Sequence, residues 1–216
     1  MTTATGLPEG ASPALHGAAR LLGRYMYRPF FRIRVHGMDC FPRTGPVVLI
    51  ANHSSFIEPQ LLLGLVPRRC VFLVKRELFV GPAGTFFRKI GQLAIDRSSP
   101  DRAPLLAAVR VLREGGMIGV FPEGTRGDGD VEAAERGAAW LVRASGATVV
   151  PVATRGTSKR ARTGFRPRVD LLVGEPFTPE IGKGSAGLAE GTEHVRGELA
   201  ELVRRLDRIR TDGEQA

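Results

Sequence analysis

A histidine and a glutamate five positions apart are the residues of this sequence best suited to acid–base chemistry. His53 follows an apolar run of strand character, residues 47–51, and Glu58 comes after four further residues. Imidazole has an unperturbed pKa of about 6.5, so it can take a proton from a hydroxyl near neutral pH. A carboxylate on its other ring nitrogen fixes the tautomer and stabilises the imidazolium that forms. The pair predicts general-base activation of a hydroxyl at a strand end.

The spacing of this pair restricts how it can work. On a continuous helix of 3.6 residues per turn, side chains five apart point about 140° from each other. The two groups can meet only if His53 lies in the turn ahead of a helix and Glu58 in its first turn. A second interpretation is open: Ser55 and Glu58 could form a capping box at a helix start, with Asn52 or His53 merely lining the turn.

Three further motifs stand beside predicted element ends. Residues 91–97, Gly-Gln-Leu-Ala-Ile-Asp-Arg, end in an arginine that could bind a phosphate through two hydrogen bonds or pair with a surface carboxylate. Residues 122–126, Pro-Glu-Gly-Thr-Arg, form a turn that offers anion contacts, although an ordinary turn explains them too. The run Val-Pro-Val at 150–152 fits a pocket wall.

Together the four motifs resemble those of the lysophosphatidic acid acyltransferase family of glycerolipid acyltransferases. That family's signature is His, four residues and an acidic residue, then Gly-x-x-x-Ile-x-Arg, Phe-Pro-Glu-Gly-Thr-Arg and Val-Pro-Val, and the resemblance covers residues 47–157. It implies that His53 is the base and Glu58 its orienting partner. It implies an acceptor-binding set of Arg97, Glu123, Gly124, Thr125 and Arg126.

The same resemblance implies that the acyl donor is a thioester of coenzyme A or of acyl carrier protein. We expect direct transfer, with no metal and no cofactor. Two positions depart from the family pattern: the usual acid of the first motif is Asp rather than Glu58, and the third motif usually ends in Ser where this chain has Gly127. A Glu is found in related acyltransferases that use other lipid acceptors, so the acceptor stays open.

Three functions follow from these residues. The first is acylation of a lysophospholipid, most simply lysophosphatidic acid, to give phosphatidic acid. The second is acylation of a glycolipid or another lipid hydroxyl. The third is a non-catalytic, basic protein that binds lipid or nucleic acid; Phe165 is the one aromatic in the basic run 155–168, which disfavours base stacking and hence nucleic acid.

The hydrophobic pattern predicts the fold that must position these motifs. The 216 residues suffice for one domain. Short apolar runs at 47–51, 70–74, 117–121, 148–152 and 169–173 predict buried strands, and they alternate with helical segments at 56–66, 103–114 and 133–145. We therefore expect a single α/β domain with a mixed, mostly parallel sheet flanked by helices. An amphipathic helix over 195–209 should pack on it, and the Gly-rich residues 182–191 should form a loop.

The N-terminal residues 1–35 form a tail and an amphipathic segment that we set apart from the acyltransferase domain at 36–216. Leucines and aromatics alternate there with Arg20, Arg24, Arg28 and Arg32, a composition typical of an interfacial helix. Plain packing on the core explains the apolar residues equally, and Pro29 should interrupt or end the helix. The segment thus predicts an amphipathic helix that contacts either a membrane or the domain.

Charge and hydropathy suggest where the chain works. The formal net charge is +9, which favours a polyanionic partner such as anionic lipid or a phosphorylated substrate. The basic run 155–168 could meet donor phosphates, an acidic carrier protein or lipid headgroups, or could be a solvated loop. No stretch reaches the ~18 apolar residues of a spanning helix and no secretory signal is evident. We expect a cytoplasmic protein, peripheral on the inner face of the cell membrane, with Cys40 and Cys70 as reduced thiols.

Overall fold

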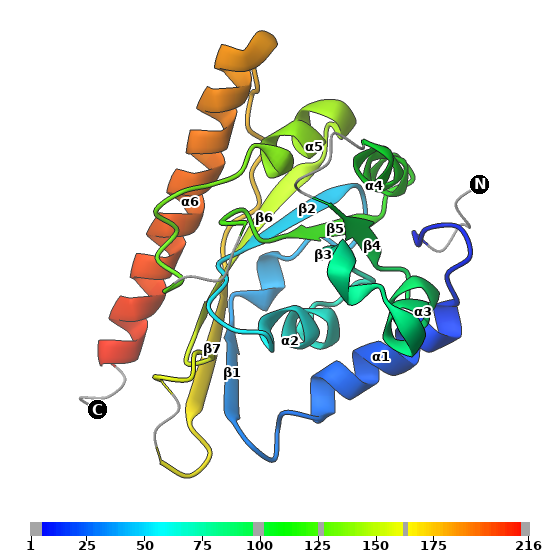
Figure 1. Cartoon of the computed structure of the whole chain (residues 1–216). Helices are drawn as coiled ribbons and strands as arrows, with labels where there is room; N and C mark the ends of the chain where they lie inside the picture. Colours follow the sequence, from blue (N-terminus) through cyan, green and yellow to red (C-terminus); the bar gives the residue numbers. More distant parts are fainter. Residues whose placement is uncertain (1–5, 97–101, 125–127, 162–163, 213–216) are drawn as a thin grey trace.

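A central β-sheet organises the chain, and the computed structural model describes residues 6–96, 102–124, 128–161 and 164–212 (Figure 1). Within these residues the sheet has seven strands. Their spatial order is β1 (Arg32–His36), β7 (Arg168–Val173), β6 (Thr148–Arg155), β2 (Val47–Ala51), β5 (Met117–Val120), β3 (Val71–Lys75) and β4 (Leu93–Ile95). Neighbouring strands are parallel except β6 and β7, which are antiparallel. The prediction of a mixed, mostly parallel sheet in one α/β domain is confirmed.

Helices cover both faces of the sheet. One face carries α1 (Pro13–Tyr25) and α2 (Glu58–Leu65), and the other carries α4 (Ala103–Arg113), α5 (Gly137–Ser145) and α6 (Gly184–Asp212) (Figure 1). The helix α3 (Gly81–Lys89) lies near α1, and short 3-10 turns occur at η1 (Met38–Cys40) and η2 (Arg76–Leu78). Since both faces are covered, the central strands are apolar on both sides, as parallel strands in such layers usually are.

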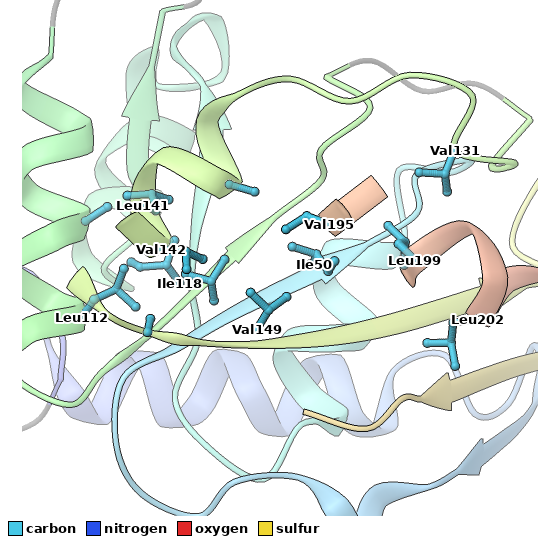
Figure 2. Packing of buried hydrophobic residues seen from close by; sticks show 14 of the residues in the cluster. Ile50, Leu112, Ile118, Val131, Leu141, Val142, Val149, Val195, Leu199 and Leu202 are labelled. Carbon is cyan, nitrogen blue, oxygen red and sulfur yellow. The ribbon is translucent and has the colours of Figure 1, made fainter. Parts of the chain in front are cut away.

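The strand β2 shows how one short sequence serves two cores. Val48 and Ile50 point into the cluster beneath α4, α5 and α6, whereas Val47 and Leu49 join the cluster beneath α2. This alternation follows from the two-residue period of a strand. In Figure 2, Ile50 lies among side chains from α5 and α6 that converge on the strands. Burying each such side chain contributes roughly 1.5–3 kcal/mol, so the strand that ends at the site is held firmly from both faces.

The helices α1 and α2 cross in direct backbone contact. A Cβ added at Gly23 would stand 2.3 Å from the Gln60 carbonyl oxygen, and one at Gly64 would stand 2.2 Å from the Arg24 nitrogen. Only glycine fits at these two points, so the crossing fixes the N-terminal helix on the helix that begins with Glu58. The helix α1 ends at Tyr25, before Pro29, and residues 32–36 form β1, which pairs with β7.

Five elements differ from the sequence predictions. The edge strands β1 and β4 and the helix α3 were not predicted, and α5 begins at Gly137 rather than at 133. The expectation of a loop over 182–191 was wrong, because α6 begins at Gly184. The glycines there serve close packing: a Cβ at Gly187 would lie 2.3 Å from the carbonyl carbon of Gly182, and one at Gly191 would lie 2.8 Å from Ile181.

Candidate active site

The carboxyl ends of three neighbouring parallel strands bring the candidate residues together. His53 follows β2 by two positions, Glu123 follows β5 by three, and Thr157 follows β6 by two. Because β5, β2 and β6 are adjacent and parallel, these three segments leave the sheet at the same edge. Ligands of open α/β sheets bind at that edge.

His53 and Glu58 form a direct pair. His53 lies in the turn ahead of α2, Glu58 is the first residue of that helix, and His53 Nδ1 is 2.8 Å from Glu58 Oε2. This arrangement meets the condition that the five-residue spacing imposed. Because a carboxylate only accepts, Nδ1 carries the proton and Nε2 is left as the acceptor, a tautomer that we assign from the hydrogen bond. The competing capping box does not fit, since it needs the acidic residue at the third helical position.

The carboxylate of Glu58 is fully buried and saturated with donors. Its Oε2 also accepts from the Ser54 N–H at 2.9 Å, and its Oε1 accepts from the hydroxyls of Ser54 at 2.7 Å, Thr157 at 2.5 Å and Thr154 at 3.3 Å. Burial by itself raises the pKa of Glu58, but the hydrogen bonds from His53, Thr157 and Ser54 outweigh it and hold the pKa below its ordinary value. The group therefore stays ionised beside the imidazole at neutral pH.

The turn after β5 packs against the backbone and ring of the histidine. Glu123 Oε1 accepts from the His53 N–H at 2.7 Å, and the Phe121 ring centroid lies 4.3 Å from that of His53. Burial raises the pKa of Glu123, and the backbone N–H and charge of His53 counter it only in part. Gly124 is buried with φ of +74°, a conformation that glycine adopts readily. Glu123, expected in the acceptor site, thus lies against the main chain of the candidate base.

A cavity of about 820 Å³ opens beside His53. Its wall is mainly apolar, and charged side chains of both signs also line it. The cations are Lys75 at the end of β3 and Arg102 just before α4, and the carboxylates are Glu77, Asp96 and Glu135. A pocket of a few hundred cubic ångströms or more with convergent polar groups suits a ligand of lipid size. The apolar wall includes Phe56, Phe72, Leu78, Phe87, Leu105 and Phe121.

Three of the predicted acceptor residues lie outside the described residues: Arg97, Thr125 and Arg126. The structure adds four groups that the sequence interpretation missed, namely Ser54 and Thr157 on the Glu58 carboxylate and Lys75 and Arg102 in the cavity. The contact of Ser54 with Glu58 could have been predicted, because its hydroxyl comes directly after the histidine. Thr157 gave none, because it is 99 residues from Glu58 in sequence.

Two polar residues, the buried Asn52 and the half-buried Arg155, fix the loop that follows the third motif. Asn52 links β2 to β6, since it accepts from the Thr154 N–H at 2.7 Å, and its amide donates to the Gly129 carbonyl at 3.0 Å. Arg155 binds Asp207 of α6 and Asp130 of the loop at 2.7 and 2.6 Å. Burial lowers the pKa of Arg155, but these two carboxylates raise it more. The charge of Arg155 is therefore balanced by carboxylates of the protein itself and is not available to an anionic partner.

Comparisons with known proteins identify the family. The sequence model of the Acyltransferase family matches residues 32–155, more than half of the chain. The chain belongs to the acyltransferase family. The predicted resemblance to the lysophosphatidic acid acyltransferases is confirmed, and with it the prediction of an O-acyltransferase. Within the described ranges, no group of three or more His, Cys, Asp and Glu side chains could hold a metal ion.

Relatives of this acyltransferase come from bacteria, plants and animals. A 1-acyl-sn-glycerol-3-phosphate acyltransferase of Bacillus subtilis is 29% identical over 82% of this chain and 91% of its own length. A human 1-acyl-sn-glycerol-3-phosphate acyltransferase beta is 36% identical, but this chain covers only 48% of that protein. The crystal structure of the 1-acyl-sn-glycerophosphate acyltransferase of Thermotoga maritima superposes with a TM-score of 0.73 at 26% identity, over 89% of this chain and 79% of that one.

Proposed function

We propose that this acyltransferase transfers a fatty acyl group from a thioester to the free hydroxyl of lysophosphatidic acid and so forms phosphatidic acid. The observation that carries the proposal is the 2.8 Å contact between His53 and Glu58 at the wall of a cavity that is apolar and also bears Lys75 and Arg102. The names of the relatives from Bacillus subtilis and Thermotoga maritima support lysophosphatidic acid as the acceptor.

In the proposed reaction His53 acts as general base through Nε2. It takes the proton of the lysolipid hydroxyl as that oxygen attacks the thioester carbonyl. The imidazolium is stabilised by Glu58 on the opposite nitrogen, and collapse of the tetrahedral intermediate breaks the C–S bond. The proton passes from His53 to the leaving thiolate, which departs as the free thiol. Holding the hydroxyl and the carbonyl in attack geometry supplies at most about 7–11 kcal/mol of the acceleration.

The cations of the cavity suit an acceptor that carries a phosphate. Lys75 and Arg102 line the cavity from two different elements, beside the carboxylates of Glu77, Asp96 and Glu135. Guanidinium and ammonium groups bind phosphate through charge-assisted hydrogen bonds. Arg97 and Arg126 are proposed to add to this set on the family resemblance.

An acyl-transfer assay tests the proposed acceptor. Purified protein is given acyl-CoA and, separately, acyl carrier protein thioester, with a panel of lysophosphatidic acid, other lysophospholipids and a glycolipid in mixed micelles. We expect a kcat/KM for lysophosphatidic acid at least about tenfold above the others, and Lys75→Ala should raise KM for it more than for an uncharged acceptor. Transfer to other hydroxyls with none to lysophosphatidic acid would overturn the proposal and favour the glycolipid alternative.

We also propose that the enzyme binds peripherally to anionic lipid at the inner face of the cell membrane. Within the described ranges no helix has the length and apolar character needed to cross a bilayer. The buried side of α1 faces α2, and its outer side nonetheless exposes Leu15, Leu21, Leu22 and Tyr25. The exposed Phe165 of the β6–β7 loop lies near the end of this helix, since Arg166 donates to the Arg28 carbonyl. Apolar side chains ringed by arginine favour an anionic interface.

Vesicle sedimentation tests this membrane contact. The wild type should pellet with phosphatidylglycerol vesicles and much less with neutral ones. Leu22→Glu should reduce the bound fraction severalfold, because it places a charge on the exposed apolar side of α1. Leu106→Glu is the matched control: this leucine is also half exposed, but it lies on α4, which covers the opposite face of the sheet from α1. Equal loss in both variants would contradict docking through α1.

A further inference from the structure

Thr157 reaches the catalytic pair from the carboxyl end of the neighbouring strand β6. The strand β6 ends at Arg155, and Gly156 follows with φ of +86°. A Cβ at that glycine would lie 2.0 Å from the Arg168 carbonyl oxygen, so only glycine permits the turn. The turn brings Thr157, which is fully buried, against the carboxylate of Glu58. The residue lies beyond the segment 32–155 that matches the family model.

The contacts at Glu58 divide between its two oxygens. Oε2 faces His53, whereas Oε1 accepts the hydroxyl protons of Thr157 at 2.5 Å and Ser54 at 2.7 Å. These two hydroxyl oxygens are 3.1 Å apart, so together they enclose Oε1. An aspartate at position 58 would be shorter by one C–C bond, ~1.5 Å. The added methylene of Glu58 is what carries a carboxylate oxygen to Thr157.

We propose that Thr157 is a positioning residue of the acyl transfer, one that holds Glu58 ionised and aimed at His53 and so lets the longer acid take the place of the family's usual aspartate. This inference rests on the proposed function. Thr157 donates to the Glu58 carboxylate and contacts the Ser54 hydroxyl, so its effect on His53 passes through Glu58. A neutral donor stabilises the carboxylate without neutralising it, so the charge remains available to an imidazolium.

Apart from His53, the charged groups described around Glu58 do not stabilise its carboxylate, so neutral donors must do so. Its nearest ionisable neighbour is His53, and Glu123, on the turn after β5, adds repulsion. Beyond them Asp130 of the following loop is paired with Arg155 of β6, which also binds Asp207 of α6. Repulsion from Glu123 and complete burial both favour protonation of Glu58, and the hydroxyl and N–H donors oppose it.

Valine and serine at position 157 separate the hydroxyl from the shape of the side chain. Thr157→Val removes the donor at nearly constant volume, and Thr157→Ser keeps it. Loss of one hydrogen bond to a charged group should lower kcat about 10- to 100-fold in Thr157→Val, while Thr157→Ser should stay within about threefold of wild type. The matched control is Thr192→Val, which deletes a hydroxyl bonded to the Leu188 carbonyl on α6, far from the pair in the chain. It should leave kcat unchanged.

Two readouts distinguish positioning from a structural effect. The acidic limb of the pH profile of kcat/KM should move to higher pH in Thr157→Val, because Glu58 then holds a proton more readily. In a Glu58→Gln background the same valine substitution should change kcat less than about twofold, since the carboxylate that it serves is gone. An unmoved limb in the first experiment, or an undiminished loss in the second, would overturn the inference. The double variant also buries no charge, so it tests the idea even if Thr157→Val folds poorly.

A measurement without substrate separates this inference from the proposed function. The carboxyl ¹³C resonance of Glu58 in labelled protein should titrate at higher pH in Thr157→Val than in wild type. That result would stand even if the wild type transferred no acyl group to any acceptor, which would overturn the proposed function alone. Identical titrations in an active enzyme would overturn the role of Thr157 and leave the proposed function intact.

Discussion

Two buried carboxylates in this acyltransferase each contact a histidine, yet their surroundings differ. Glu58 lies 2.8 Å from His53 Nδ1, and Asp170 of β7 lies 3.4 Å from His36 Nε2. Both carboxylates are fully buried. Asp170 also contacts two guanidinium groups, Arg210 Nη1 and Arg168 Nε, each at 2.6 Å; the second is an ion pair without hydrogen-bond geometry.

The difference lies in what balances the negative charge. Guanidinium groups are always protonated, so Asp170 is neutralised whether or not His36 carries a proton. The remaining donors to Glu58 in the described part of the chain are the Ser54 N–H and the hydroxyls of Ser54, Thr157 and Thr154, which carry no net charge. An imidazolium at His53 therefore gains the full benefit of the carboxylate. A histidine beside a carboxylate is thus proposed to support proton transfer in one place, whereas in the other the carboxylate ties α6 to the sheet through Arg210.

Removal of each histidine should give the largest contrast. His53→Ala deletes the proposed base and should lower kcat/KM about 10³- to 10⁴-fold, the upper range for general acid–base catalysis. His36→Ala, the matched control, should stay within about threefold of wild type, because Asp170 keeps both arginines. Acyl transfer to lysophosphatidic acid, with circular dichroism to verify folding, measures both. Comparable losses would show that the two pairs do not differ in function.

Neutralising the two carboxylates should separate catalysis from stability. Glu58→Gln keeps the shape but offers an amide where His53 needs an acceptor charge, so kcat should fall about 10²- to 10³-fold with KM little changed. Asp170→Asn should leave kcat of the folded protein near the wild-type value. Steady-state kinetics at fixed donor concentration test this. A change in KM with kcat left unchanged in Glu58→Gln would contradict the orienting role.

The same Asp170→Asn change should instead weaken the fold. It leaves two arginines beside a buried position without their counterion, and loss of one partner of a buried ion pair costs about 3 kcal/mol or more. For a domain of this size that corresponds to a melting temperature lower by roughly 6–12 °C. Thermal unfolding followed by circular dichroism measures it. An unchanged melting temperature would mean that the arginines find solvent or another acceptor at no cost.

The sequence predicted the elements that lie at the centre of the sheet better than those at its edges. The strands β2, β5, β6 and β7 are short apolar runs buried on both faces. Such an unbroken apolar run is easy to recognise in a sequence. The strand β1, Arg-Ile-Arg-Val-His, is largely exposed and polar because it forms an edge, and β4 has only three residues. The helix α3 contains two glycines and a proline, which local propensity disfavours.

For the site, local spacing was informative and long-range pairing was not. The contact between His53 and Glu58 depends on a single turn of the chain. The spacing alone therefore predicted that it forms if His53 precedes the helix and Glu58 lies in its first turn. The position of Thr157 beside Glu58 depends on β6 lying next to β2, which no residue of either segment encodes. Similarly, Glu123 is expected in the acceptor site from its motif, but its bond to the His53 N–H requires the pairing of β2 with β5.

The smallest expected effect is a pH dependence of stability that belongs to Glu58. Its pKa in the folded protein is held below the ordinary carboxyl value, which is about 4.3 in an unfolded chain. The carboxylate therefore contributes stability that is fully present above pH ~4.3 and is lost as the pH falls through the folded pKa. Urea unfolding of wild type and Glu58→Gln at pH 7 and at about pH 3.5 should show a difference in unfolding free energy that shrinks at the lower pH. If that difference does not change with pH, folding does not favour the anion, and the hydroxyl shell of Glu58 does not offset its burial.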